Sequence, residues 1–423
     1  MASGDIRGKT VAIVGGGPGG CGTAIRLAQL SRERDLGLRV VLFEGKDFEH
    51  HYNQCAGVLS PPIEELLQDR LGVELPYDIY KRQIFGYRLH AGKKEILLVG
   101  DHKGGATYAV RRVVFDRFFL SCAEKGGAEV SHSRVTAIDF PKKGRDNVFL
   151  YTEGGMLKAD VVVGAFGLDD GMMSVFETAT GGKYRRPGDY MHTFVVKIST
   201  DRAFIEKKLG SIIYAYLFPP GIPNLDFGAI TPKGDHVIVN VAGRRATVED
   251  MFAFLSLDIV RDHLPPLSRD SLEVYRGKFP GKPARGATGD RYLVVGDATG
   301  WMRPFKGKGI NMAIQTGIQA AETIVDHGTD SASLLKYEER SRQLRDDYLY
   351  GSWMRHLCKA GEITGMLGTI LSMAKVNQEV HDALFSAVSG HGSFRDIFTR
   401  YARPRVLADV VRNYVRDRRR GRS

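Results

Sequence analysis

The order of apolar and polar positions near the N-terminus predicts a strand, a tight turn, a helix and a second strand. Residues 11–14 are an unbroken apolar run, which is typical of a buried strand. Glycines dominate residues 15–20, and beyond them small and apolar residues recur at helical spacing as far as residue 30. A second apolar run occupies residues 38–43. This order predicts the first unit of a doubly wound α/β domain, in which helices connect parallel strands.

Two later regions show different patterns. Between residues 212 and 218, aliphatic residues alternate with aromatic ones, which predicts a strand whose two faces differ. Segments 226–230 and 236–241 predict two more strands, so we expect a mainly antiparallel sheet here. From Ser331 to the C-terminus the pattern is helical.

The glycine-rich turn has the chemistry of a nucleotide-binding site. Gly15, Gly17 and Gly20 have the spacing G-x-G-x-x-G, which gives a tight turn, a close approach of the backbone to a pyrophosphate and close packing of helix on strand. The free N–H groups at the start of the helix favour an anion. Glu44 ends the second strand 24 residues after Gly20, near the distance at which a carboxylate binds ribose hydroxyls. Together these features predict a bound nucleotide, although Glu44 alone would be interpreted as a solvated strand end.

Length and composition exclude several classes of protein. At 423 residues, the chain is expected to form two or three domains, or one large domain with insertions. Its four cysteines are widely separated and form no C-x-x-C pair, so we predict no metal site and no disulfide framework, and a reducing cytoplasm fits best. The N-terminus lacks the apolar segment of a secretory signal, and no run of 18 apolar residues predicts a membrane span.

Positive charge is concentrated at the C-terminus. The net charge is +11, and residues 400–423 hold nine arginines and two aspartates, which is +7 of that total. The rest of the chain is only mildly basic and shows no nucleic-acid-binding module, so we expect no nucleic-acid partner. Within the tail, apolar residues recur at helical spacing: Val406, Leu407, Val410, Val411, Tyr414 and Val415. Such a helix suits an anionic membrane surface, which would make the protein peripheral, and it equally suits packing on the protein with a solvated basic end.

Two segments resemble flavoproteins whose FAD domain is of the aromatic-hydroxylase type. Arg112, Phe115 and Asp116 match the pattern R-x-x-F-D, and the resemblance implies that Arg112 lies near the flavin pyrophosphate. Asp297 follows a predicted strand at residues 292–295, and the resemblance implies that it binds the ribityl chain. The alternative for this second segment alone is another strand–turn–helix with a capping aspartate.

The helix that follows Asp297 completes this resemblance. It opens with Gly307, Gly309, Ile310 and Asn311, whose backbone N–H groups would face the electron-rich edge of the flavin. A helix N-terminus there would stabilise the negative charge of a reduced flavin. The predicted cofactor is therefore FAD.

One segment departs from the pattern of these flavoproteins. Residues 161–167 form the expected strand and turn, but Phe166-Gly167 stands where the group has Asp-Gly. Asp169 or Asp170 would have to substitute for the missing carboxylate. The electron donor is therefore left open between NAD(P)H and a reduced carrier protein.

Two motifs resemble the geranylgeranyl reductase family. Tyr214, Tyr216 and Phe218 resemble that family's aromatic motif, which lines an apolar cavity beside the flavin, although Tyr216 stands where a tryptophan is usual. Cys55, in the sequence Cys-Ala-Gly, matches a cysteine loop that follows the first FAD unit. The resemblance implies that Cys55 and Tyr216 are catalytic. The alternatives are a small packed cysteine without chemistry and an ordinary sheet face.

The resemblance implies a flavin-dependent reductase that saturates carbon–carbon double bonds of an isoprenoid or another apolar substrate. Two alternatives are a flavin monooxygenase or halogenase, and a lipid-binding flavoprotein without catalysis. The predicted fold is α/β with an interrupted doubly wound FAD-binding domain, an antiparallel-sheet substrate domain and a helical C-terminal region. Their predicted boundaries are 1–75, 100–185 and 280–330 for the first, 76–99 and 186–279 for the second, and 331–423, including the basic tail, for the third.

Overall fold

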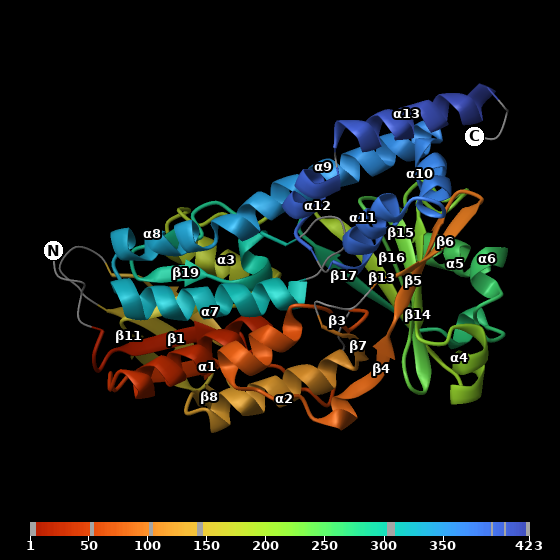
Figure 1. The fold of residues 1–423 in the computed structure, drawn as a ribbon. Coiled ribbons are helices and arrows are strands. Elements are labelled where there is room, and N and C mark those ends of the chain that lie inside the picture. Colours follow the sequence, from red (N-terminus) through yellow and green to blue (C-terminus); the bar gives the residue numbers. More distant parts are fainter. Residues whose placement is uncertain are drawn as a thin grey trace.

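Two main sheets lie next to each other, and a line of C-terminal helices extends along both (Figure 1). The computed structural model describes residues 6–50, 55–100, 105–141, 147–302, 309–390, 392–401 and 403–419. Red, orange and cyan segments, distant in sequence, form the left half of the view, and green segments with orange β5 and β6 form the sheet on the right. The protein is thus a mixed α/β protein with a helical C-terminal region.

The first sheet has six strands and is almost entirely parallel. In spatial order they are β18 (Thr288–Gly289), β19 (Tyr292–Val294), β12 (Val161–Gly164), β1 (Thr10–Val14), β2 (Arg39–Phe43) and β8 (Glu129–Ser131). Only β18 runs antiparallel to its neighbour, β19. The central strands read as unbroken apolar runs because both faces of a parallel sheet are covered.

Four helices in the described part of the chain accompany this sheet. They are α1 (Pro18–Glu33), α2 (Arg112–Lys125), α3 (Asp170–Ala179) and α7 (Gly309–His327). Helix α1 packs on both α2 and α7. A Cβ atom at Gly317 of α7 would lie 2.3 Å from the carbonyl oxygen of Gly19 in α1, so only glycine permits this close crossing. The close packing fixes the N-termini of α1 and α7 relative to each other.

The second sheet has seven strands and is antiparallel except between β14 and β5. In spatial order they are β17 (Val274–Phe279), β13 (Met191–Ser199), β16 (His236–Gly243), β15 (Phe227–Pro232), β14 (Ile212–Leu217), β5 (Gly86–Ala91) and β6 (Lys94–Val99). Three short helices accompany its connections: α4 (Arg202–Lys208), α5 (Val248–Ser256) and α6 (Asp258–Arg261).

Smaller sheets and short helical turns complete the fold. One three-stranded sheet holds β3 (Val58–Leu59), β7 (Thr107–Val110) and β4 (Tyr80–Ile84), and another holds β11 (Gly155–Ala159), β10 (Val148–Thr152) and β9 (Val135–Asp139). Short helical turns are η1 (Glu65–Asp69), η2 (Tyr77–Ile79), η3 (Arg269–Ser271) and η4 (Gly296–Thr299).

The C-terminal region is helical as far as the structure describes it. Its helices are α8 (Ser331–Arg340), α9 (Arg342–Thr364), α10 (Met366–Ala374), α11 (Gln378–Ser389), α12 (Phe394–Tyr401) and α13 (Pro404–Arg419). Leu371 of α10 and Phe385 of α11 pack on Tyr87 and Leu98 of the second sheet. On α13, Val410 joins the same cluster, and the Tyr414 hydroxyl donates to the carbonyl of Thr364, so part of the tail's apolar side packs on the protein.

Candidate active site

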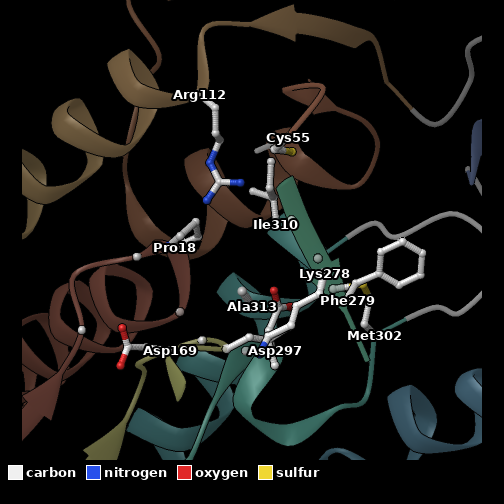
Figure 2. A pocket seen from close by; sticks show the side chains of 18 of the residues that line it. Pro18, Cys55, Arg112, Asp169, Lys278, Phe279, Asp297, Met302, Ile310 and Ala313 are labelled. Atoms are coloured by element: carbon white, nitrogen blue, oxygen red, sulfur yellow. The ribbon is translucent and has the colours of Figure 1, made fainter. Parts of the chain in front are cut away.

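A cavity of about 1530 Å³ lies between the glycine-rich turn and the second sheet (Figure 2). Its lining combines the start of α1, the end of β2, the cysteine loop, the N-termini of α2 and α7, and one face of β13–β15. Most of the residues predicted for the site meet here: Gly15, Gly17, Glu44, Cys55, Arg112, Asp297, Gly309, Ile310 and Asn311. Segments from both halves of the chain therefore build one site.

The glycine-rich turn presents backbone donors to the cavity. Gly15 has φ +111°, and a Cβ there would lie 2.5 Å from the carbonyl oxygen of Ala165. Gly20 does not line the cavity but packs so tightly under the turn that its Cβ would lie 1.9 Å from the Gly15 carbonyl oxygen. Helix α1 begins without a side-chain cap and without an acidic residue in its first turn, so its first N–H groups remain available to an anion.

Glu44 joins this turn to the second strand. Its carboxylate is buried and accepts hydrogen bonds from the backbone N–H groups of Gly16, at 3.0 Å, and Lys46, at 2.8 Å. The side chain also lines the cavity, which leaves it positioned beside any ribose bound at the end of β2.

Asp297 lies in η4, directly before α7. Its Oδ1 atom is buried and has no hydrogen-bond partner among the described residues. Burial raises the pKa of this carboxyl to about 6, against the opposing effect of the Arg112 charge. A buried carboxylate oxygen without a donor is costly, so a ligand that donates to it would supply the partner that the described residues do not.

The start of α7 is fixed against the cysteine loop region. Asn311 Nδ2 donates to the carbonyl of Ser60 at 2.6 Å, and Gly309 and Ile310 line the cavity next to it. Gly307, the first residue predicted for this helix start, lies outside the described residues.

Arg112 and Cys55 lie together at the cavity wall. Figure 2 shows the Arg112 side chain extending into the cavity beside Cys55. Burial lowers the pKa of the Arg112 guanidinium, but the Asp116 carboxylate, 2.7 Å from Arg112 Nε, and the Cys55 sulfur more than offset this and raise it. The guanidinium is thus a permanent positive charge beside Cys55, and its electrostatic effect reaches Asp297.

Lys233 is a part of the site region that sequence reasoning missed. It lies in the turn between β15 and β16, where a lysine next to glycine and aspartate ordinarily faces water, so no local signal marks it. Instead the side chain is buried, and Nζ donates to the carbonyls of Ala56 at 2.6 Å, Gly57 at 2.8 Å and Val110 at 3.0 Å.

The aromatic motif does not line the cavity, and this corrects the prediction for Tyr214, Tyr216 and Phe218. Tyr216 lies on the opposite face of the sheet, where its hydroxyl donates to the Ile259 carbonyl at 2.9 Å and its ring packs on Phe254. Tyr214 lies on the same face, with its hydroxyl 3.3 Å from the Lys208 carbonyl. The position of Tyr216 therefore gives no support to a catalytic role.

Phe218 lies just beyond the end of β14. It has φ +47° and packs with the residues between the sheet and the C-terminal helices, and it is not among the lining residues. The reason for the correction is the two-residue period of a strand, which directs successive side chains to opposite faces. The aliphatic half of the alternation faces the cavity: Ile213, Ala215 and Leu217.

This aliphatic wall extends across neighbouring strands. Ala215 pairs with Ala229 of β15 and with Leu89 of β5, and all three line the cavity. The small alanines leave room over the middle of the sheet.

Phe166, which stands where related flavoproteins have aspartate, has a packing role, because its ring is buried against Phe176 and Tyr184.

The two aspartates that would substitute for the missing carboxylate both line the cavity. Asp169 caps α3 by accepting from the N–H of Met172 at 2.8 Å, and Asp170 accepts from Lys278 Nζ at 2.7 Å. Their role toward a pyrophosphate stays a prediction.

The residues present fit FAD. The open space at Gly17, the uncapped start of α1 and the unpaired Asp297 oxygen are the features that a diphosphate and a polyhydroxylated chain would complete. Comparison with known proteins agrees, because the model of the FAD binding domain family matches residues 9–349. The chain belongs to this family. It is an FAD-dependent oxidoreductase.

The FAD-dependent oxidoreductase is similar to curated reductases over most of its length. It is 27% identical over 355 residues to geranylgeranyl diphosphate reductase of Nicotiana tabacum, covering 79% of this chain and 71% of the relative. It is 25% identical over 351 residues to digeranylgeranylglycerophospholipid reductase of Methanococcus vannielii, covering 80% and 83%. These relatives confirm the resemblance to geranylgeranyl reductases.

Solved structures share the fold over nearly the whole chain. A geranylgeranyl bacteriochlorophyll reductase-like protein from Thermoplasma acidophilum aligns with a TM-score of 0.69 at 18% identity, covering 96% of this chain and 99% of the other. A flavin-dependent brominase aligns with a TM-score of 0.67 at 19% identity, covering 97% and 99%. At these identities the likeness concerns the fold alone, so the choice of reaction depends on the cavity.

Proposed function

We propose that this flavoenzyme is a reductase that saturates carbon–carbon double bonds of an isoprenoid or a similarly apolar chain. The observation that carries the proposal is the pairing of two walls in one cavity. The flavin-binding residues form one wall, and the aliphatic face of the second sheet forms the other, with Cys55 at their junction. The volume of about 1530 Å³ exceeds the roughly 300–1,000 Å³ usual for a single small ligand, which supports space for a substrate beside the cofactor.

Each part of this lining has a definable task. Reduced FAD held at this site would supply the hydride chemistry for one alkene carbon. The aliphatic wall of Leu89, Ala215 and Leu217 holds an apolar chain and excludes water from it. In this proposal the Cys55 thiol donates a proton to the other alkene carbon, which leaves a thiolate that takes its next proton from water. Arg112, beside the sulfur, stabilises that thiolate electrostatically.

The test is turnover without oxygen. Chemically reduced enzyme is mixed anaerobically with geranylgeranyl diphosphate, and the product mass is measured. The proposal predicts products heavier by two mass units for each reduced bond. An oxygen or halogen atom in the product, together with a requirement for oxygen, would instead support the monooxygenase or halogenase alternative. Binding without any turnover would support the lipid-binding alternative.

The C-terminal surface supports peripheral attachment to a membrane. Along α9, four apolar side chains are each more than half exposed: Leu349 at 56%, Trp353 at 69%, Leu357 at 56% and Ile363 at 79%. Their spacing places them on one side of the helix, over roughly 20 Å of its length. Among the residues that the structure describes, no helix is long and apolar enough to cross a membrane.

The basic helix α13 adjoins one end of this apolar stripe, since Tyr414 bonds to Thr364, next to Ile363. Its outer side carries exposed Arg412 and Arg416, whose charge complements anionic headgroups, while tryptophan and leucine suit the layer beneath them. We therefore propose that the occupant of this surface is an anionic bilayer. Trp353→Ser should weaken sedimentation with phosphatidylserine-containing vesicles and leave flavin content unchanged. Tyr77→Ser, at a site 91% exposed and far along the chain, is the matched control. Equal sedimentation of all three proteins would refute the membrane surface.

The domain boundaries at 1–75, 100–185 and 280–330, at 76–99 and 186–279, and at 331–423 stay predictions, as does the electron donor. Limited proteolysis of the flavin-loaded protein tests the boundaries, and stopped-flow mixing with NADPH tests direct reduction.

A further inference from the structure

Lys233 has an unusual position for a lysine. It is 1% exposed, and it follows β15 in the turn to β16, where its own N–H donates to the His236 carbonyl at 3.0 Å. The side chain leaves the second sheet and ends among backbone carbonyls of the flavin-binding side of the molecule. It therefore connects two parts of the fold that lie more than 100 residues apart in sequence.

The three acceptors of Lys233 are neutral. Burial lowers the pKa of this ammonium to about 7, although the nearby Cys55 acts in the opposite direction. Placing a cation here is costly, and an apolar side chain of similar length would fill the same volume without that cost. Packing alone therefore does not account for a lysine, whereas fixing three carbonyls at hydrogen-bond distance requires its three donors.

The carbonyls belong to the two segments that carry the reactive side chains of the cavity. Ala56 and Gly57 directly follow Cys55, and Val110 precedes Arg112 by two residues. The segments also bond directly, because Val110 N donates to the Gly57 carbonyl at 2.8 Å. Gly57 has φ +62°, and its N–H lies 3.4 Å from the Cys55 sulfur, so the loop turns sharply at this point.

We propose that Lys233 is a positioning residue, which holds the cysteine loop against the second sheet and thereby fixes the Cys55 thiol at the wall of the cavity beside Arg112. Without these three hydrogen bonds the described part of the loop would lose its side-chain link to the turn between β15 and β16, and the thiol would sample positions away from the cavity wall. The catalytic consequence rests on the proposed function. The placement of the thiol does not, and it can be measured without turnover.

The experiment measures alkylation of Cys55 in the flavin-loaded, full-length protein. Wild type and Lys233→Met are treated with iodoacetamide, and labelling of each cysteine is followed by peptide mass spectrometry. Cys55 should react faster in the variant by about tenfold or more, the factor expected when one charge-assisted hydrogen bond is lost. Cys122 and Cys358 in the same sample should react at unchanged rates, which separates a moved loop from general unfolding.

Two further variants complete the test. Lys81→Met is the matched control, because the half-buried Lys81 donates to the carbonyl of Asp78 and to neither segment of the site, so Cys55 labelling should stay at the wild-type rate. Lys233→Arg keeps hydrogen-bond donors at the site and should restore at least part of the protection of Cys55. If Lys233→Met does not fold, the decisive comparison is between Lys233→Arg and Lys233→Gln.

Equal labelling of Cys55 in wild type and in a folded variant without donors would overturn the proposal, as would a parallel increase at all cysteines. A failure of alkene reduction in wild type would refute the proposed function and leave the labelling result unaffected. If both the positioning role of Lys233 and the reductase function are correct, Lys233→Met should lower kcat. The KM for geranylgeranyl diphosphate should stay within about twofold, because the apolar wall is intact.

Discussion

Replacing Asp297 by asparagine should stabilise the apoprotein and weaken FAD binding. Burial raises the pKa of this carboxyl from 3.8 to about 6, a shift of about 2 units that corresponds to about 3 kcal/mol as an upper value. Between these two pH values the folded state binds more protons than the unfolded state, so the free energy of unfolding falls as pH rises through the window. Above pH 6 the folded state bears the full cost of the buried, ionised carboxylate, and Asp297→Asn removes that cost.

The assay is thermal unfolding of flavin-free protein between pH 4 and pH 8, with wild type and variant side by side. The variant should unfold at a higher temperature at pH 7.5, and the difference should disappear toward pH 4. FAD affinity should fall about tenfold or more, because a neutral amide is a weaker acceptor than a carboxylate. A variant that is no more stable at pH 7.5, or that binds FAD as tightly as wild type, would refute the reasoning.

Two further predictions concern the cavity walls. Gly17→Val should lower flavin content because its side chain would enter the open space beside the turn, whereas Gly188→Val, which also meets open space but lies away from the cavity, should not. Ala215→Leu should raise the KM for a polyprenyl substrate by filling the cavity wall, while Tyr216→Phe should leave KM unchanged and cost about 1 kcal/mol of stability through the lost bond to Ile259. Absorbance spectra measure the flavin content, and steady-state kinetics measure KM. A higher KM in Tyr216→Phe than in Ala215→Leu would indicate that Tyr216, and not Ala215, contacts the substrate.

The flavin-binding wall was predictable because its chemistry is local in sequence. A G-x-G-x-x-G turn needs glycine for steric reasons that hold wherever the turn occurs, and Glu44 ends the second strand at the spacing expected for a ribose-binding acid. Arg112 and Asp297 were predicted through the resemblance of their segments to flavoprotein motifs. The parallel sheet then brings the glycine-rich turn, Glu44 and Asp297 to the same end of the fold, and Arg112 reaches the cavity from the start of α2. Their convergence on one cavity therefore followed from topology.

The substrate wall was predicted only in part, because alternation shows that a strand has two faces and does not show which one is covered. Tyr214 and Tyr216 appeared suited to an apolar cavity, yet their hydroxyls need acceptors and find them on the opposite side, at Lys208 and Ile259. Lys233 could not be predicted at all. Its acceptors are backbone carbonyls of a distant loop, and nothing in the turn around it differs from a solvated one.

The C-terminal tail illustrates a third limit of prediction from sequence. Its periodicity correctly predicted a helix, α13, but could not decide between a membrane and the protein surface as the partner of its apolar side. Val410 and Tyr414 contact the protein, and the exposed apolar stripe that favours a membrane lies instead on α9, where Trp353 was not singled out. A helical period identifies an amphipathic element, and only the packed structure shows which apolar residues remain uncovered.

The most direct test of the proposed reaction is a single-turnover comparison of wild type with Cys55→Ala. Both enzymes are reduced chemically, mixed anaerobically with geranylgeranyl diphosphate, and followed by flavin absorbance and product mass. Wild type should reoxidise its flavin while forming a product two mass units heavier, and Cys55→Ala should bind the same substrate but react about 10²–10⁴-fold more slowly, the range expected when general-acid transfer is lost. Product that forms only with oxygen and contains an oxygen or halogen atom would contradict the account.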